Sequence, residues 1–242
     1  MDTNQRVLHE IEHGKQISSN AESVWNWSSP AGKVRAERRG NYFIDIAKIN
    51  KNDIVLEIGC GTGLFTEMVF KKTGAKLTAT DISNELLNQA RLKAPQVNFI
   101  IDDAMKMNFP STSFDVVYGS SILHHLEMDI TLKEIFRVLK TNGRMIFAEP
   151  NMINPQIFIQ KNIPFIKKLL GDSPDETAII RWEFVKLMKA VGFKKIQVFP
   201  YDFLHPITPK PLIKIVNAIG KTIEKIPIFK EIAGSVIIYG EK

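Results

Sequence analysis

Residues 55–63 read Val-Leu-Glu-Ile-Gly-Cys-Gly-Thr-Gly, and this stretch decides the fold. An apolar run of the kind found in buried strands carries an acid near its end and then breaks into glycines spaced G-x-G-x-G. Glycines at such a point let the backbone turn tightly and let a ligand lie close against it. The stretch therefore predicts a strand followed by a ligand-binding loop.

The residues beside this loop indicate the charge of its ligand. A dinucleotide site holds a pyrophosphate on the N-terminus of the next helix, and its third glycine would stand where Leu64 stands here. Glu57 also places a carboxylate beside the loop, where it would repel a pyrophosphate. That carboxylate suits a cationic ligand, such as the ammonium and sulfonium groups of S-adenosylmethionine. Both residues argue against a nicotinamide-dependent oxidoreductase, which stays open as an alternative.

Two more predicted strands end in acids. The run at 76–80 leads into Asp81, and the run at 97–101 leads into Asp102-Asp103. An acid about 20 residues past a glycine loop is placed to accept hydrogen bonds from two ribose hydroxyls. A single aspartate at a strand end could equally well cap the next helix. Three strand ends with acids beside a glycine loop favour a binding edge, because open α/β sheets bind ligands there.

These motifs together resemble the class I S-adenosylmethionine-dependent methyltransferases, in the small-molecule group that includes the ubiquinone and menaquinone biosynthesis enzymes. The resemblance runs from about Asn52 to Pro150. It rests on the segments 55–63 (VLEIGCGTG), Asp81-Ile82, 102–126 (DDAMKMNFPSTSFDVVYGSSILHHL) and 134–150 (EIFRVLKTNGRMIFAEP). It implies that S-adenosylmethionine is the cofactor and S-adenosylhomocysteine the product. The methyl acceptor does not follow, because one fold hosts many activities.

The resemblance also implies roles for single residues around the methionine end of the cofactor. Glu57 would meet that end of the cofactor, and Ser120 would lie near the methionyl amine. The loop residues that would frame the cofactor are Gly59, Cys60, Gly61 and Gly63.

Four further residues would hold the adenosine end of the cofactor. By the same resemblance, Asp81 would bind the ribose and Ile82 would pack on the adenine. Asp103 and Ala104 would meet the edge of the adenine ring.

Composition and charge fit one domain of 242 residues. Apolar residues make up 44% of the chain, which is enough for a core, and no apolar run is long enough for a spanning helix. The first residues are polar and mixed in charge, unlike a signal peptide. The only cysteine, Cys60, excludes an internal disulfide and fits a reducing compartment, so we expect a cytoplasmic protein. Between glycines it is expected to be a small side chain rather than a nucleophile.

The order of the predicted elements gives the fold class. Strands and helices alternate, which predicts an α/β protein with a doubly wound, mostly parallel sheet and helices on both faces. The resemblance implies a Rossmann-like sheet of seven strands whose last strand is antiparallel. We expect strands at 53–58, 76–80, 97–101, 114–119, 144–149, 193–199 and 236–239. We expect helices from Pro30 to about Lys48 and at 64–72, 84–93, 130–140 (ended by Asn142-Gly143) and 181–191.

Residues 151–171 and 203–231 are insertions in this pattern. Each carries a net charge of +3, so together they hold the whole formal charge of +6. Both are amphipathic, and apolar residues recur at helical spacing between Leu212 and Ile226. We interpret them as a helical cap over the substrate that packs its apolar face on the domain. A basic amphipathic surface could instead lie on an anionic membrane or meet a lipid-like substrate. Nucleic acid is disfavoured, because the chain lacks a recognition motif.

The first 48 residues are interpreted as a second cap. They include Trp25, Trp27, Arg35 and Arg39, and related enzymes close this region over the cofactor. An ordinary packed helix with a solvated arginine face is equally consistent with the sequence.

Catalytic residues are sought among groups that could take a proton. Methyl transfer is an in-line displacement at a carbon that the sulfonium already activates, so positioning alone can supply most of the acceleration. A general base helps when the acceptor is a hydroxyl, and histidine suits this task near neutral pH. His124 and His125 follow the fourth predicted strand, and Glu149 at the end of the fifth could orient one of them. We favour His125 as the base; a histidine that bonds backbone at a helix start is the alternative.

The sequence thus predicts a methyltransferase for a small-molecule or lipid-linked acceptor, with oxygen favoured over nitrogen or carbon. His205, in the second insertion, is a weaker catalytic candidate, and no residue cluster has metal-ligand spacing, so no metal site is predicted. Two alternatives remain, the oxidoreductase and a membrane-associated protein that binds the cofactor without turnover. The sequence does not indicate the oligomeric state.

Overall fold

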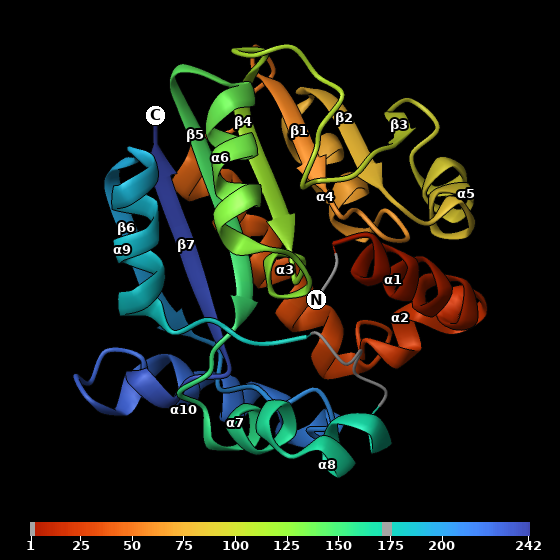
Figure 1. Ribbon diagram of the computed structural model, residues 1–242. Coiled ribbons are helices and arrows are strands. Elements are labelled where there is room, and N and C mark those ends of the chain that lie inside the picture. The colour runs from red at the N-terminus through yellow and green to blue at the C-terminus, as the bar shows by residue number, and fades with distance from the viewer. Residues whose placement is uncertain (1–2, 171–175) are drawn as a thin grey trace.

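The computed structural model describes residues 3–170 and 176–242, and a seven-stranded sheet forms its centre (Figure 1). The strands are β1 (Ile54–Ile58), β2 (Lys76–Asp81), β3 (Asn98–Ile101), β4 (Phe114–Ser120), β5 (Leu139–Pro150), β6 (Lys194–Tyr201) and β7 (Ser235–Glu241). Their order is β3-β2-β1-β4-β5-β7-β6, and β7 alone runs antiparallel to its neighbours. This confirms the predicted doubly wound sheet with an antiparallel last strand.

Helices cover both faces of the sheet and bury one core on each. One face carries α3 (Pro30–Ala47), α4 (Leu64–Thr73) and α5 (Asn84–Lys93), and the other carries α6 (Met128–Val138) and α9 (Arg181–Val191). Adjacent residues of β1 show the alternation, since Val55 belongs to the first core and Leu56 to the second, both fully buried. Burial on both faces explains why this strand reads as a continuous apolar run.

The order in which successive strands are added to the sheet reverses between β1 and β4. From β1 the strands extend outward through β2 and β3, and from β4 they extend the other way through β5. Open α/β sheets bind ligands beyond the carboxyl ends of the strands at such a switch point. The glycine loop that follows β1 lies at this point.

The predicted start of α3 is confirmed, and the predicted end of α6 is wrong. Ser29 caps α3 by accepting a hydrogen bond from the Gly32 backbone N–H at 2.9 Å, with Pro30 as the first helical residue. The helix expected at 130–140 ends at Val138 instead, and β5 begins at Leu139. The Asn142-Gly143 pair lies within β5, where Asn142 has a φ of 62°. Lys242 exchanges backbone hydrogen bonds with both residues of the pair. A pair that often ends a helix here marks an irregularity in a strand.

Both insertions form helices at the same end of the sheet. The first contains α7 (Pro155–Asn162) and α8 (Pro164–Leu169), and the second contains the 3-10 turns η3 (Lys210–Leu212) and η4 (Phe229–Ile232) around α10 (Ile213–Ile223). Figure 1 shows α7, α8 and α10 gathered beyond the ends to which the β4 and β5 arrows point. Gly171, the last residue of the first insertion, lies outside the described residues. No helix in the described part of the chain has the length and apolarity to span a bilayer.

The N-terminal segment begins with two helices that the sequence did not delimit. They are α1 (Thr3–Ile17) and α2 (Ala21–Val24), and α1 packs beside α5 (Figure 1). Together with the start of α3 they lie over the carboxyl edge of the sheet, next to the glycine loop.

Candidate active site

A cavity of about 820 Å³ lies at the carboxyl edge of the sheet. Its wall is made by the loops after β1, β2, β3 and β4, by α1 and the segment after α2, and by parts of both insertions. The cavity therefore joins the three regions that the sequence assigned separately to cofactor, cap and substrate.

The glycine loop lines this cavity with backbone in a conformation that residues with a side chain rarely adopt. Gly59 has a φ of +63°, and a Cβ there would lie 2.4 Å from the Ile122 side chain. Gly61 has a φ of +53°, and a Cβ there would lie 3.0 Å from the Trp25 ring. Both glycines border the cavity, whereas Gly63 is not part of its wall.

Cys60 also lines the cavity, and its surroundings keep it unreactive. The side chain is buried, and burial together with the charge of Asp81 raises the pKa of its thiol. A protonated thiol is a poor nucleophile. This supports the interpretation of Cys60 as a small side chain that the loop tolerates.

Asp81 faces the cavity and holds the loop in place. Its Oδ2 accepts a hydrogen bond from the Gly61 N–H at 2.8 Å, and its Oδ1 accepts one from the Ser83 N–H at 2.9 Å. Burial raises the pKa of this carboxyl despite the hydrogen bonds that favour its charge. Each carboxylate oxygen has a second lone pair for a ligand hydroxyl, so anchoring the loop and binding a ribose are compatible roles.

The structure places Glu57 outside the cavity wall. Its side chain is buried, and Oε2 accepts hydrogen bonds from the hydroxyls of Thr66 and, at 2.8 Å, Tyr118. Burial raises its pKa to about 8, so the carboxyl is largely protonated at neutral pH. The expected contact with the methionine end of the cofactor has no geometric support. The residue instead ties β1 to α4 and β4.

Four further residues that were predicted to bind the cofactor lie in the wall of the same cavity. They are Ile82, Asp103, Ala104 and Ser120. Asp103 Oδ1 accepts a hydrogen bond from the Met105 N–H at 2.8 Å, which shapes the loop after β3.

Glu149 orients His124 rather than His125. Its Oε2 lies 2.7 Å from His124 Nδ1, and its Oε1 accepts hydrogen bonds from the N–H groups of Ile122 and Leu123, each at 3.0 Å. Burial raises the pKa of Glu149 to about 7. Burial and the neighbouring His125 lower the pKa of His124 well below its ordinary value, so His124 is neutral at physiological pH. His124 lines the cavity, whereas Glu149 lies behind it.

His125 has a different environment, made by two acids. Its Nδ1 lies 3.0 Å from Glu10 Oε2 and 3.6 Å from Glu176 Oε1. Burial acts to lower the pKa of His125, but the nearby carboxylates of Glu10 and Glu176 outweigh it and raise that pKa. Its Nε2 has no hydrogen-bond partner among the residues that the structure describes.

Three charged residues near His125 were not predicted from the sequence to belong to the site. Lys161 was counted with the basic insertion, but its side chain is buried and pairs with Glu176. Glu176 precedes α9 and Glu10 lies on α1, and neither sits in a motif. Only their convergence in space assigns them to the site, so no signal in the sequence could have found them.

His124, His125 and Glu176 are the group with metal-ligand geometry within residues 3–170 and 176–242. One ligand atom each from His124, His125 and Glu176 lie within 4.8 Å of one another. Lys161 already supplies a cation to the Glu176 carboxylate. The negative charge of Glu176 is therefore balanced by Lys161 without a metal ion. His205, the weaker candidate, borders the cavity from the second insertion, where its Nε2 lies 3.1 Å from the Gln156 side-chain nitrogen.

Comparison with known proteins identifies the class. A methyltransferase-domain family matches residues 56–147. A demethylmenaquinone methyltransferase of Chlorobaculum tepidum is 30% identical over 166 residues, covering 62% of this chain and 69% of the relative. A 2-methyl-6-phytyl-1,4-hydroquinone methyltransferase of Synechocystis is 32% identical over 164 residues, covering 64% of this chain and 51% of the relative.

Solved structures agree on the fold. An S-adenosylmethionine-dependent methyltransferase of Thermotoga maritima superposes with a TM-score of 0.64 at 18% identity, covering 95% of this chain and 99% of the other. A phosphoethanolamine N-methyltransferase of Haemonchus contortus gives 0.66 at 14% identity, covering 96% of this chain and 59% of the other.

The chain belongs to the class I S-adenosylmethionine-dependent methyltransferases. It is an enzyme whose cofactor is S-adenosylmethionine, as the sequence predicted, and the oxidoreductase alternative is set aside. The cavity fits this cofactor on its own geometry. Gly61 and the Trp25 ring leave a cradle without room for a Cβ, and Asp81 presents a carboxylate at the end of β2.

Proposed function

We propose that the enzyme transfers a methyl group to the hydroxyl oxygen of a small or lipid-linked acceptor, with His125 as the general base. The observation that carries this proposal is the environment of His125. The side chain lines the cavity, two carboxylates hold its Nδ1 side, and Nε2 has no partner among the described residues. An imidazole arranged in this way can accept a proton at Nε2.

In the proposed reaction the acceptor oxygen exchanges its proton for a methyl group. When bound, the cofactor supplies a methyl carbon that its sulfonium makes electrophilic. With the cofactor bound, His125 Nε2 would take the hydroxyl proton as the acceptor oxygen receives the methyl group, and S-adenosylhomocysteine would be the product. Glu10 and Glu176 stabilise the resulting imidazolium, since both lie within 3.6 Å of Nδ1. The neutral His124 borders the same space and would orient the acceptor by hydrogen bonding.

A lipid-linked acceptor is supported by the surface around the cavity mouth. Leu170 and Ile207 line the cavity and are nevertheless 54% and 76% exposed, so the cavity is continuous with an apolar surface. The insertions carry more apolar residues than they bury against the domain. Ile213 of α10 packs against Ala31 and Leu204. The exposed apolar residues that form what we call the apolar rim are Phe158, Phe165, Leu169, Leu212, Ile215, Ile219, Ile228 and Phe229.

The apolar rim is accompanied by unpaired positive charge. Its exposed lysines, which have no ion-pair partner in the described part of the chain, are Lys168, Lys210, Lys214, Lys221 and Lys225. Apolar side chains among unpaired lysines are typical of surfaces that lie on anionic membranes. We therefore propose that the insertions form a substrate cap that also rests on a membrane and receives the acceptor from it.

A second candidate acceptor atom is a ring carbon. Two relatives are named for lipid-linked quinone or hydroquinone substrates, and a relative from Methylococcus capsulatus, 25% identical, is named a C-methyltransferase. Deprotonation of a ring hydroxyl by His125 would also activate the adjacent carbon, so the same base serves both outcomes.

The test is turnover on matched acceptors. Methyl-labelled S-adenosylmethionine is supplied with simple alcohols, phenols and hydroquinones, each with and without a prenyl chain, and mass spectrometry locates the methyl group. The proposal expects methyl on oxygen and a lower KM for the prenylated compounds. Methyl on a ring carbon would establish the second candidate. Bound S-adenosylhomocysteine without turnover on any acceptor would favour a cofactor-binding protein without this activity.

A further inference from the structure

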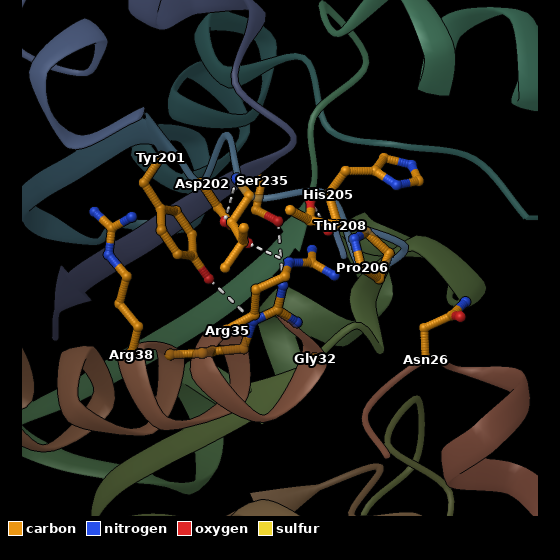
Figure 2. A network of polar contacts seen from close by, with 12 residues as sticks. Asn26, Gly32, Arg35, Arg38, Tyr201, Asp202, His205, Pro206, Thr208 and Ser235 are labelled. Carbon is orange, nitrogen blue, oxygen red and sulfur yellow. Dashed lines mark hydrogen bonds and ion pairs between the residues drawn. The ribbon is translucent and has the colours of Figure 1, made fainter. Parts of the chain in front are cut away.

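Arg35, on α3, lines the cavity and forms an ion pair with an acid at the end of β6. Its Nε donates to Asp202 Oδ2 at 2.6 Å. Figure 2 shows the two side chains facing one another, with His205 in the same network. The Asp202 carboxylate is buried, and its Oδ1 accepts a hydrogen bond from the Leu204 N–H at 3.2 Å. The charge of Arg35 is therefore balanced within the protein, and its Nε edge is held in place.

The other edge of the Arg35 guanidinium makes no such contacts. Its Nη1 and Nη2 have no hydrogen-bond acceptor among residues 3–170 and 176–242. Arg38 of the same helix differs, because its Nη1 and Nη2 both donate to Glu224 and Nη2 also donates to Tyr42. The Arg35 side chain is only 15% exposed. Polar groups with little access to water are usually hydrogen-bonded, so a ligand in the cavity is the expected acceptor.

A second donor comes from the contact between the two insertions. His205 Nδ1 accepts a hydrogen bond from the Ile207 N–H at 3.3 Å, so a neutral ring carries its proton on Nε2. Burial, and after it the charge of Arg35, lowers the pKa of His205 and keeps the ring neutral. The Gln156 side-chain nitrogen lies 3.1 Å from Nε2, and two N–H groups cannot bond each other. A half-turn of the amide brings its oxygen to Nε2. The NH2 group of Gln156 is then left for another acceptor.

These donors belong to the part of the cavity wall that the insertions build. Gln156 lies on α7 of the first insertion and His205 in the second, and both line the cavity together with Arg35. The charge of Arg35 acts on His205, so these side chains lie close to one another. None of the three is assigned to the cofactor, and the insertions are interpreted as the substrate cap. An acceptor under this cap is therefore the ligand to consider.

We propose that Arg35 and Gln156 form a donor site for a second oxygen of the acceptor, one that is uncharged and is not methylated. The site rests on the proposed function and deepens it, because it adds a contact to the same acceptor. A further anion would leave uncompensated negative charge, since Asp202 already balances Arg35. A hydroxyl or carbonyl oxygen accepts the hydrogen bonds without adding charge. A cation is excluded, because the two side chains offer donors only.

The test measures acceptor binding in the complex with S-adenosylhomocysteine, in which no methyl transfer occurs. Calorimetry compares geranylhydroquinone with the two geranylphenols that each lack one of its hydroxyls. Wild type is expected to bind the hydroquinone about tenfold more tightly than either phenol, which is the contribution of two uncharged hydrogen bonds.

Four variants locate this preference. Arg35→Lys keeps a cation for Asp202 but lacks both Nη groups, and Gln156→Leu removes the amide from an exposed position. Each should reduce the preference to about threefold, because one hydrogen bond remains, and the double variant should abolish it. Arg38→Lys and Asn162→Leu are the matched controls from the same two helices. They lie outside the cavity wall and should keep the wild-type preference.

The other outcomes overturn the site. Wild type that binds the hydroquinone no more tightly than the phenols contradicts it, as does a preference that survives in the double variant. Tighter binding of a geranylated hydroxybenzoate, in which a carboxylate replaces one hydroxyl, would contradict an uncharged ligand. If Arg35→Lys fails to fold, Gln156→Leu decides alone. The proposed methyl transfer is tested separately, because simple alcohols and phenols turn over without a second oxygen.

Discussion

Glu10 Oε2 lies 3.0 Å from His125 Nδ1, which joins the first helix of the chain to the residue proposed as the general base. A second contact reinforces the first, since Arg6 Nε donates to the His125 backbone oxygen at 2.5 Å and Arg6 Nη1 pairs with Glu127 at 2.9 Å. Helix α1 therefore contacts the loop after β4 at the His125 ring, at the His125 backbone and at Glu127. The chemistry at His125 should depend on α1.

His125→Ala should lower turnover by roughly 10²–10⁴-fold, the usual contribution of a positioned general base. S-adenosylhomocysteine affinity should stay nearly unchanged, because His125 is not assigned to the cofactor. Steady-state kinetics and calorimetry measure the two effects separately. His124→Ala is the comparison, and equal activity in the two variants would leave positioning as the sole source of acceleration.

The dependence of kcat/KM on pH should show the effect of the Glu10 carboxylate on His125. His125 accepts a proton only when neutral, so kcat/KM should fall as pH falls through its pKa, which Glu10 and Glu176 raise above the ordinary value of 6.5. Glu10→Gln removes one of these carboxylates, lowers that pKa and should move the acid limb of the profile to lower pH. Glu12→Gln, an exposed change on the same helix, should leave the profile unmoved. An unchanged limb in Glu10→Gln would contradict the pairing.

Asp81→Ala should weaken S-adenosylhomocysteine binding at least tenfold, because a charge-assisted hydrogen bond contributes roughly 1.5–3 kcal/mol. The variant should also unfold at a lower temperature, since Asp81 accepts hydrogen bonds from the Gly61 and Ser83 N–H groups. Asp81→Asn keeps one acceptor oxygen and separates the two effects. Unaltered affinity in a folded Asp81→Ala protein would remove Asp81 from the ligand site.

Glu57 should make stability depend on pH in an unusual direction. Burial raises its pKa from 4.5 to about 8, so between these values the folded state holds a proton that the unfolded state has released. The free energy of unfolding therefore falls as pH rises through this window. Glu57→Gln keeps the shape without the titration, and its thermal unfolding should vary less with pH, whereas exposed Glu37→Gln should follow wild type. A marked loss of cofactor affinity in Glu57→Gln would return Glu57 to the binding site.

Membrane binding should be electrostatic and confined to the insertions. The protein should sediment with anionic vesicles at low salt and be released as salt rises, because each lysine near the surface contributes roughly 1 kcal/mol. Replacing Lys214, Lys221 and Lys225 with Glu should abolish sedimentation and spare S-adenosylhomocysteine affinity. Charge reversal of Lys48, Lys51 and Lys76, near the amino ends of β1 and β2, is the matched control. Wild-type protein that ignores anionic vesicles would leave the insertions as a cap alone.

The parts of the fold that could be predicted are those encoded locally. Gly59, Gly61 and Asp81 belong to a strand-loop pattern whose spacing is set by backbone geometry, so the structure places all three on the cavity wall. The boundary between α6 and β5 was misplaced because the Phe114–Leu139 pairing extends the sheet beyond a register shift, and the Asn142-Gly143 pair in that irregular stretch also reads as the end of a helix.

Tertiary contacts decided the rest. Glu57 has the motif position of a ligand residue, but Thr66 and Tyr118 draw it into the core. Glu10 and Glu176 reach His125 from elements far apart in sequence, and Lys161 reads as surface charge until the fold buries it. Such residues acquire a role only from the neighbours that folding gives them.

The contacts of α1 with His125 couple the position of the cap to the chemistry of the proposed base. Helix α1 borders the cavity, and it also carries the carboxylate that tunes the base. Any opening that lifts α1 from the loop would separate Glu10 from His125 and remove the stabilisation of its protonated form. The position of α1 would thus set the proton affinity of the base, so that cap and catalytic residue act as one unit.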